Sequence, residues 1–175
     1  MDIGQRNDRI ANPNSRGELI IPASHYAMIT SNQNKLKLAI YGLGSCIALI
    51  IYINKKDIHA MSHIMLPDSK RGLSDPLNIP HKYVDSSVKE LLKEFERFNV
   101  KKEDLKANIV GGSTINTDFE PILKNDIAIM KELKKYNIRI EKSHLGGSKG
   151  RCVIYDSKNN KIMLKVDGED RYRQL

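Results

Sequence analysis

The sequence constrains the fold most strongly between residues 42 and 66. Residues 46–53 read Cys-Ile-Ala-Leu-Ile-Ile-Tyr-Ile, an unbroken apolar run directly after the glycine-rich turn Gly42-Leu-Gly-Ser45. Such a run is typical of a strand buried on both faces. A polar interruption at residues 54–57 follows, and the apolar pattern resumes over residues 58–66. This succession predicts an antiparallel hairpin.

The register of this hairpin relates Cys46 to His63. If the turn pairs Ile53 with Ile58, then His63 faces Ala48 and Cys46 becomes its diagonal neighbour on the same face of the sheet. Diagonal neighbours lie ~7–8 Å apart at the backbone, close enough for an imidazole to reach a thiol. A slip of one residue would place the two side chains on opposite faces.

The remaining pattern predicts an α+β domain with a mixed β-sheet and two main helices packed on it. One helix keeps an apolar face from Val84 to Phe95, with Ser87 and Glu90 as a capping box. The other spans residues 125–136, with Ile127, Met130 and Leu133 facing the core. Further strands are predicted at 18–22, 26–30, 35–41, 106–110, 138–144, 151–156 and 161–166.

Length and composition indicate one domain. A chain of 175 residues can bury a substantial core, and we expect a flexible polar tail over residues 1–16 and a folded domain over 17–175. The longest apolar run is far shorter than the ~20 residues that span a bilayer, and the N-terminus lacks the apolar core of a signal peptide. We therefore expect a cytoplasmic protein without membrane insertion.

Charge and cysteine content narrow the function. The net charge of +8 is spread along a chain with 6% aromatic residues and no nucleic-acid-binding signature, which disfavours nucleic acid. A basic surface suits an acidic protein partner or serves only solubility. The two cysteines are expected to be thiols, with Cys152 a small core residue. His59, His81 and His144 lack metal-ligand spacing, so neither a metal nor a cofactor is expected.

Cys46 and His63 suggest a cysteine hydrolase. A histidine can hold a thiol as a thiolate-imidazolium pair and later protonate a leaving group. Backbone N–H groups of the turn at Gly44 and Ser45 could stabilise the oxyanion that forms when a carbonyl is attacked. The competing interpretation is structural, because buried cysteines in strands and hydrogen-bonded histidines are both common.

Several segments, taken in order, resemble the CheD family of chemoreceptor glutamine deamidases. These are Gly42-Leu-Gly-Ser-Cys46-Ile-Ala-Leu, Ala60-Met-Ser-His63-Ile-Met-Leu-Pro67-Asp68, Asn108-Ile-Val-Gly-Gly-Ser113 and Leu145-Gly-Gly-Ser-Lys-Gly-Arg151. The resemblance implies a fold like that of the catalytic domain of cytotoxic necrotizing factors. It also implies Cys46 as nucleophile and His63 as general acid and base, with Gly111, Gly112, Gly146 and Gly147 in supporting loops.

The resemblance further implies an activity and partners. CheD proteins deamidate glutamines on the cytoplasmic helices of chemoreceptors, releasing ammonia, and commonly bind a CheC phosphatase. Ile40 stands where the family usually has a threonine that assists the dyad, Ile122-Leu-Lys-Asn125 replaces its Gly-x-Arg-Asn, and His144 replaces an acidic residue. The alternative is therefore a catalytically weakened adaptor that binds chemoreceptors or a CheC-like phosphatase.

Overall fold

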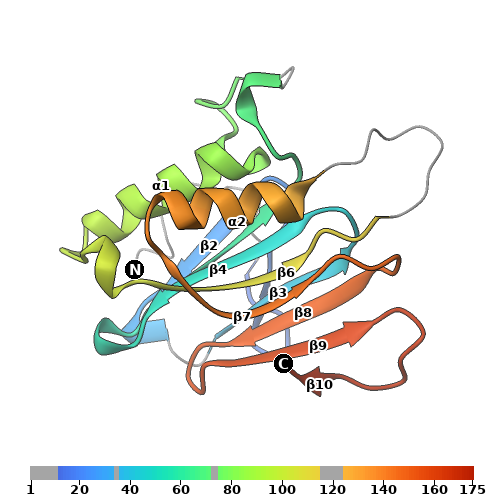
Figure 1. The fold of residues 1–175 in the computed structure, drawn as a ribbon. Coiled ribbons are helices and arrows are strands. Elements are labelled where there is room, and N and C mark those ends of the chain that lie inside the picture. The colour runs from blue at the N-terminus through green and yellow to red at the C-terminus, as the bar shows by residue number, and fades with distance from the viewer. Residues whose placement is uncertain (1–11, 34–35, 72–74, 115–123) are drawn as a thin grey trace.

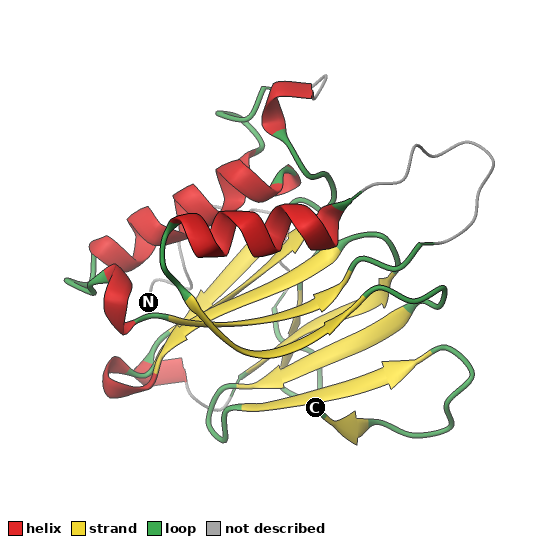
Figure 2. Cartoon of the chain, in the orientation of Figure 1, coloured by secondary structure: helices red, strands yellow, loops and turns green. Residues whose placement is uncertain are grey.

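The computed structural model describes residues 12–33, 36–71, 75–114 and 124–175, which form a single domain of strands and helices (Figures 1 and 2). Its α-helices are α1 (Val84–Glu96) and α2 (Asn125–Lys135). Its strands are β1 (Glu18–Ile20), β2 (Tyr26–Ile29), β3 (Lys37–Leu43), β4 (Ile47–Ile53), β5 (Ile58–Ile64), β6 (Lys106–Gly111), β7 (Arg139–Leu145), β8 (Arg151–Asp156), β9 (Lys161–Val166) and β10 (Arg173–Gln174).

The strands form two mixed sheets of five strands each. One has the order β1-β3-β8-β9-β10 and the other has the order β2-β5-β4-β6-β7. Neighbouring strands are antiparallel except for the parallel pairs β1–β3 and β6–β7. The predicted α+β class is confirmed, whereas the single sheet that we expected is replaced by two.

The central strand β4 explains why two sheets are needed. All its residues are buried, and they alternate between two cores: Leu49 and Ile51 pack on the helix side, and Ala48 and Ile50 pack on the other. Helices α1 and α2 cover one face of the β4 sheet, and the second sheet covers the opposite face (Figures 1 and 2). The molecule therefore has three layers, with β4 in the middle layer.

The hairpin of β4 and β5 has the predicted register. Ile53 pairs with Ile58, and Ala48 pairs with His63. The turn between the strands closes at Asp57, which adopts a left-handed conformation with φ of 51°. Since register decides which face each side chain occupies, this agreement fixes the side on which His63 lies.

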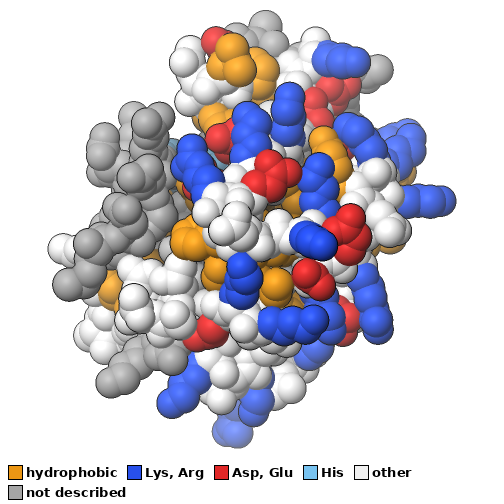
Figure 3. Space-filling model, turned by 90° about the vertical axis from the view of Figure 1, so that its left-hand side faces the viewer, with side chains coloured by type: hydrophobic (Ala, Val, Ile, Leu, Met, Phe, Trp, Pro, Cys, Tyr) orange, Lys and Arg blue, Asp and Glu red, His pale blue; other side chains and the backbone are white. Residues whose placement is uncertain are grey.

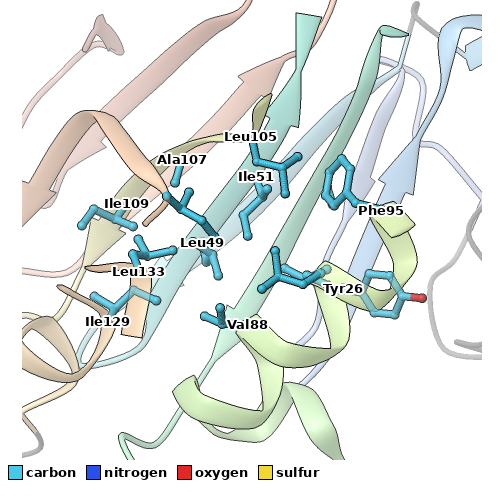
Figure 4. Packing of buried hydrophobic residues seen from close by; sticks show 14 of the residues in the cluster. Tyr26, Leu49, Ile51, Val88, Phe95, Leu105, Ala107, Ile109, Ile129 and Leu133 are labelled. Atoms are coloured by element: carbon cyan, nitrogen blue, oxygen red, sulfur yellow. The ribbon is translucent and has the colours of Figure 1, made fainter. Parts of the chain in front are cut away.

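Helix α2 presents a different face to the core from the one we predicted. Ile129 and Leu133 are buried against the β4 sheet, together with Val88 and Phe95 of α1 (Figure 4). Leu133 faces the core as expected, but Ile127 and Met130 are 47% and 46% exposed, respectively. The prediction was wrong for these two residues because α2 carries two apolar stripes and only one of them packs.

Two other details of the prediction need correction. Ser87 does not cap α1, which begins without a side-chain cap; its hydroxyl instead lies 2.8 Å from the hydroxyl of Ser62 and 3.0 Å from Nδ1 of His81. Cys152 is only partly buried, because alternate residues of β8 point inward and Cys152 belongs to the other set. Val153 and Tyr155 fill the core instead.

The N-terminal segment is described from residue 12 onward. Residues 1–11 of the predicted tail lie outside the described residues. Asn14 forms a turn that leads into β1, in which its side chain donates to Glu18 and its backbone carbonyl accepts from the N–H of Gly17. Within the described ranges, neither helix is both long and apolar enough to cross a membrane.

Candidate active site

The segments singled out in the sequence meet at one end of the two sheets. The terminal pairs of three ladders connect one sheet in a chain: Ile64 with Ile47, Ile47 with Gly111, and Gly111 with Leu145. In the other sheet, Leu43 pairs with Arg151. The end of β6 and the beginning of α2 lie at this end, on the right of Figure 1. Topology therefore gathers turns that are far apart in the chain.

Cys46 and His63 lie on the same face of the β4 sheet, toward the second sheet. Cys46 is partly buried and packs against the core between the sheets. His63 pairs with Ala48, which belongs to that same core. The structure therefore places Cys46 and His63 on the same face of the β4 sheet, as the hairpin register required.

The backbone of the segment before β2 holds His63 in place. Its Nδ1 lies 3.2 Å from the carbonyl oxygen of Ile21, which can only accept, so Nδ1 carries the proton and Nε2 is left as a base. The N–H of His63 donates to the carbonyl of His25, and its carbonyl accepts from Ser24. The sequence carries no signal for the Ile21 contact, because a backbone carbonyl is available at every residue.

Burial sets the charge of this histidine. The side chain is 8% exposed, and desolvation lowers the pKa of His63 below its ordinary value, although the hydrogen bond to Ile21 acts in the opposite direction. The imidazole is therefore neutral near pH 7. Burial therefore acts against the imidazolium form of His63 that the expected thiolate-imidazolium pair contains.

The turn before Cys46 is supported by the loop after β6. The N–H of Gly112 donates to the carbonyl of Cys46 over 2.8 Å, and the N–H of Ser113 donates to Gly44 over 3.1 Å. A Cβ atom at Gly111 would lie 2.1 Å from the carbonyl oxygen of Cys46. The predicted pair Gly111 and Gly112 therefore lies against the turn of Gly44 and Ser45.

The second glycine pair extends this support. Gly146 donates its N–H to the carbonyl of Gly111, and Gly147 accepts from the N–H of Thr114. Arg151, which is 2% exposed, holds the turn by donating to the carbonyls of Gly146 and Lys149. This role of Arg151 was not predicted, although the arginine ends the motif Leu145-Gly-Gly-Ser-Lys-Gly-Arg151.

Ile40 is a core residue of β3 without polar function. It is fully buried in the core between the sheets, and an aliphatic side chain can neither donate nor accept a hydrogen bond. Among the described residues, the carbonyl of Ile21 is the group that orients the His63 ring.

The other histidines are occupied elsewhere. His59 contacts the hydroxyl of Tyr155 and a carboxylate oxygen of Asp57, and His144 accepts from Arg151. His81 is buried beside Ser62, and burial lowers its pKa to about 3. Over the described ranges, no three histidine, cysteine, aspartate or glutamate side chains cluster as metal ligands would.

A hollow of about 690 Å³ adjoins the strand that carries His63. Its walls include Ser24 and His25, which hold the His63 backbone, and Met65. Leu77 and Ile79 line the outer side. These two residues belong to the segment 68–80, part of which lies outside the described residues.

Comparison with known proteins identifies relatives of this chain. A protein-family model described as CheD chemotactic sensory transduction matches residues 65–166. A protein of Clostridium kluyveri named probable chemoreceptor glutamine deamidase CheD is 36% identical over 138 residues, which cover 75% of this chain and 84% of that protein. A protein of the same name from Clostridium botulinum strain Hall is 34% identical over 148 residues, which cover 81% and 90%, respectively.

The family model and the relatives match different parts of the candidate site. The family model begins two residues after His63, whereas an aligned stretch covering 75% of the chain must include residues 46–63 wherever it starts. The likeness to the relatives therefore extends over both the cysteine turn and the histidine strand. Because the family model matches more than half of the chain and the relatives are similar over most of their length, this chain belongs to the CheD family.

Proposed function

We propose that this protein deamidates glutamine side chains of chemoreceptors to glutamate with release of ammonia, using Cys46 as nucleophile and His63 as general acid and base. Membership of the CheD family and the printed names of the relatives support the activity. The observation that carries the residue assignment is the pairing of Ala48 with His63, which sets Cys46 and His63 on one face at one end of the sheet. Residues 17–175 form the catalytic unit in this proposal.

The proposed reaction proceeds in two halves. Nε2 of His63 takes the thiol proton as Sγ of Cys46 attacks the carboxamide carbon of the glutamine, and the oxygen becomes negatively charged. The C–N bond then breaks as His63 gives its proton to the departing nitrogen. Ammonia is released, and the glutamine side chain remains bound to Cys46 as a thioester. Water, deprotonated by His63, attacks the thioester and releases glutamate and the thiol. No cofactor is required.

The backbone would stabilise the charged intermediate. N–H groups in the turn of Gly44, Ser45 and Cys46 lie at the start of β4, and the carbonyls of Gly44 and Cys46 are held by the loop after β6. A turn fixed in this way can present N–H groups to an oxyanion without reorganising. Removing one such donor from an enzyme typically lowers kcat about 10²–10³-fold.

The Ile21 carbonyl replaces the function expected of the family threonine. A hydrogen bond from Nδ1–H to that carbonyl fixes the tautomer that leaves Nε2 as the base. Ile40 then needs only to pack, which its complete burial allows. In this proposal, the absence of a hydroxyl at residue 40 does not make the chain an inactive adaptor.

The surface suits an acidic helical substrate. Figure 3 shows the end of the molecule on the left of Figure 1, opposite the active-site end; lysine and arginine side chains are prominent on it, and the whole chain carries a net charge of +8. Helix α2 begins at the active-site end and exposes Ile127 and Met130 beside Lys131 and Lys134. A glutamate-rich chemoreceptor helix would complement this combination. A CheC-like phosphatase is the proposed regulatory partner, and the cytoplasm the proposed location.

The test is deamidation of a chemoreceptor cytoplasmic fragment from the same organism, followed by peptide mass spectrometry. We expect wild-type protein to convert specific glutamines to glutamate, and Cys46→Ala and His63→Ala to lose conversion while keeping their circular dichroism. Cys152→Ala, the matched cysteine control, should remain active. Binding of the fragment without conversion by wild-type protein would instead establish the adaptor.

A further inference from the structure

The hydrogen-bond ladder between β4 and β5 stops just short of the proposed dyad. Its last pair is Ile47 with Ile64, and beyond it Cys46 and Met65 would form the next pair. The chain instead turns away after β5, since the N–H groups of Met65 and Leu66 both donate to the carbonyl of Lys82. Some other group must keep the cysteine turn against the end of β5.

Asn125, the first residue of α2, is that group. Its side chain is fully buried, and Nδ2 donates to the carbonyl of Ser45 over 2.8 Å and to the carbonyl of Met65 over 2.8 Å. An amide nitrogen has two N–H groups, so both are used. Asn125 thereby joins the residue before Cys46 to a residue two positions after His63.

These bonds control the geometry of the reacting groups. The peptide between Ser45 and Cys46 is planar and trans, so holding the Ser45 carbonyl also fixes the direction of the Cys46 N–H. The bond to Met65 fixes the end of the strand that carries His63. One side chain therefore sets the nucleophile, a donor of the oxyanion turn and the base relative to one another.

The amide oxygen of Asn125 indicates that this side chain is not the most stabilising choice at residue 125. Oδ1 of Asn125 is buried and has no hydrogen-bond partner among the described residues. A buried acceptor without a partner is unfavourable, and an apolar side chain of similar shape would avoid that penalty. The two N–H groups are therefore the property that an asparagine supplies here.

We propose that Asn125 is a positioning residue for deamidation, which holds the Cys46 turn and the His63 strand in reactive register through its two donated hydrogen bonds. This inference rests on the proposed function. It predicts that losing both bonds slows the chemical step while leaving substrate binding and the fold in place.

The test compares Asn125→Leu, which keeps approximate volume and removes both donors, with Asn108→Leu. Asn108 is the matched control because it is 2% exposed and also has an unpartnered buried Oδ1, but lies within β6 opposite Ile50. For Asn125→Leu we expect kcat on the receptor fragment to fall about 10–100-fold, as for small misplacements of reacting groups, with KM changed less than about twofold. Asn108→Leu should match wild type.

A second measurement does not depend on turnover. Iodoacetamide should alkylate Cys46 faster than Cys152 in wild-type protein near pH 7, because His63 assists loss of the thiol proton. In Asn125→Leu this advantage should disappear while the Cys152 rate stays constant. General loosening of the fold would instead change both rates.

The outcomes separate the two proposals. A folded Asn125→Leu protein with wild-type kcat and alkylation ratio, or an equal loss in Asn108→Leu, would overturn the role of Asn125 alone. If Asn125→Leu does not fold, Asn125→Ser decides, because its hydroxyl can donate only one bond: an intermediate kcat supports the role and a wild-type kcat refutes it. Both proposals would be refuted if wild-type protein did not deamidate the receptor fragment and its Cys46 were not alkylated faster than Cys152.

Discussion

At the scale of single residues, the site depends on close approaches of the backbone. Gly111 adopts a φ of 128°, and its Cα lies so close to the carbonyl of Cys46 that a Cβ atom there would come within 2.1 Å of the oxygen. A side chain at residue 111 would therefore push the cysteine turn out of place. Gly42 also has a positive φ, of 71°, but a Cβ there would meet no atom within 4 Å.

These two glycines provide a matched comparison. We expect Gly111→Ala to lower the free energy of unfolding by more than about 3 kcal/mol, since backbone strain and a backbone clash combine. Gly42→Ala should cost about 1–2 kcal/mol, from the left-handed conformation alone. Urea unfolding followed by circular dichroism measures both values. Equal costs would show that the contact with Cys46 is unimportant.

The sequence pointed to the proposed reacting residues but not to the groups that hold them. Cys46 and His63 could be found because a cysteine after a glycine turn and a histidine on the next strand follow from local pattern. The carbonyl of Ile21 and the amide of Asn125 act across the fold. Asn125 is the last residue of a segment that corresponds to a family motif, but the contacts of both groups depend on which segments the topology brings together.

At the scale of elements, the hairpin was predictable and the packed face of α2 was not. A strand repeats every two residues, so one pair fixes the whole register of β4 and β5. In α2, Ile129 with Leu133 and Ile127 with Met130 are both helically spaced pairs. Periodicity alone cannot decide which pair faces the sheet, and Figure 4 shows Ile129 and Leu133 directed into the core.

The exposed pair on α2 leads to a prediction about substrate binding. Met130→Glu introduces a negative charge beside Lys131 and Lys134, so we expect KM for the receptor fragment to rise about tenfold while kcat is retained. Ile20→Glu is the control, because Ile20 is 45% exposed on β1 of the other sheet. Steady-state kinetics on both variants tests this surface, and equal KM values for the two would exclude it.

At the scale of the whole molecule, three layers leave several histidines buried. The pattern of predicted strands and helices indicated the α+β class, but two sheets instead of one could not be inferred because strand pairing between distant segments has no local signature. Burial lowers the pKa of His59, His63 and His81, the last to about 3. These rings are neutral in the folded protein near pH 7.

This burial predicts a loss of stability in acid. A histidine with a depressed folded pKa stabilises the fold above its unfolded pKa of about 6.5, and that contribution is lost as the pH falls toward the folded pKa. Between pH values of about 7 and 4.5, His81 alone should reduce the free energy of unfolding by about 2–3 kcal/mol. Urea unfolding of His81→Gln should show a correspondingly smaller pH dependence. An unchanged dependence would contradict a neutral buried His81.

The most direct test of the whole account is a search for the covalent intermediate on Cys46. Wild-type protein is mixed with the chemoreceptor fragment, quenched in acid during turnover, digested and mapped by mass spectrometry. The account predicts a thioester between the Cys46 thiol and the side chain of a target glutamine, which is absent in Cys46→Ala. Continued conversion of glutamine to glutamate by Cys46→Ala, or an adduct that maps to Cys152, would contradict it.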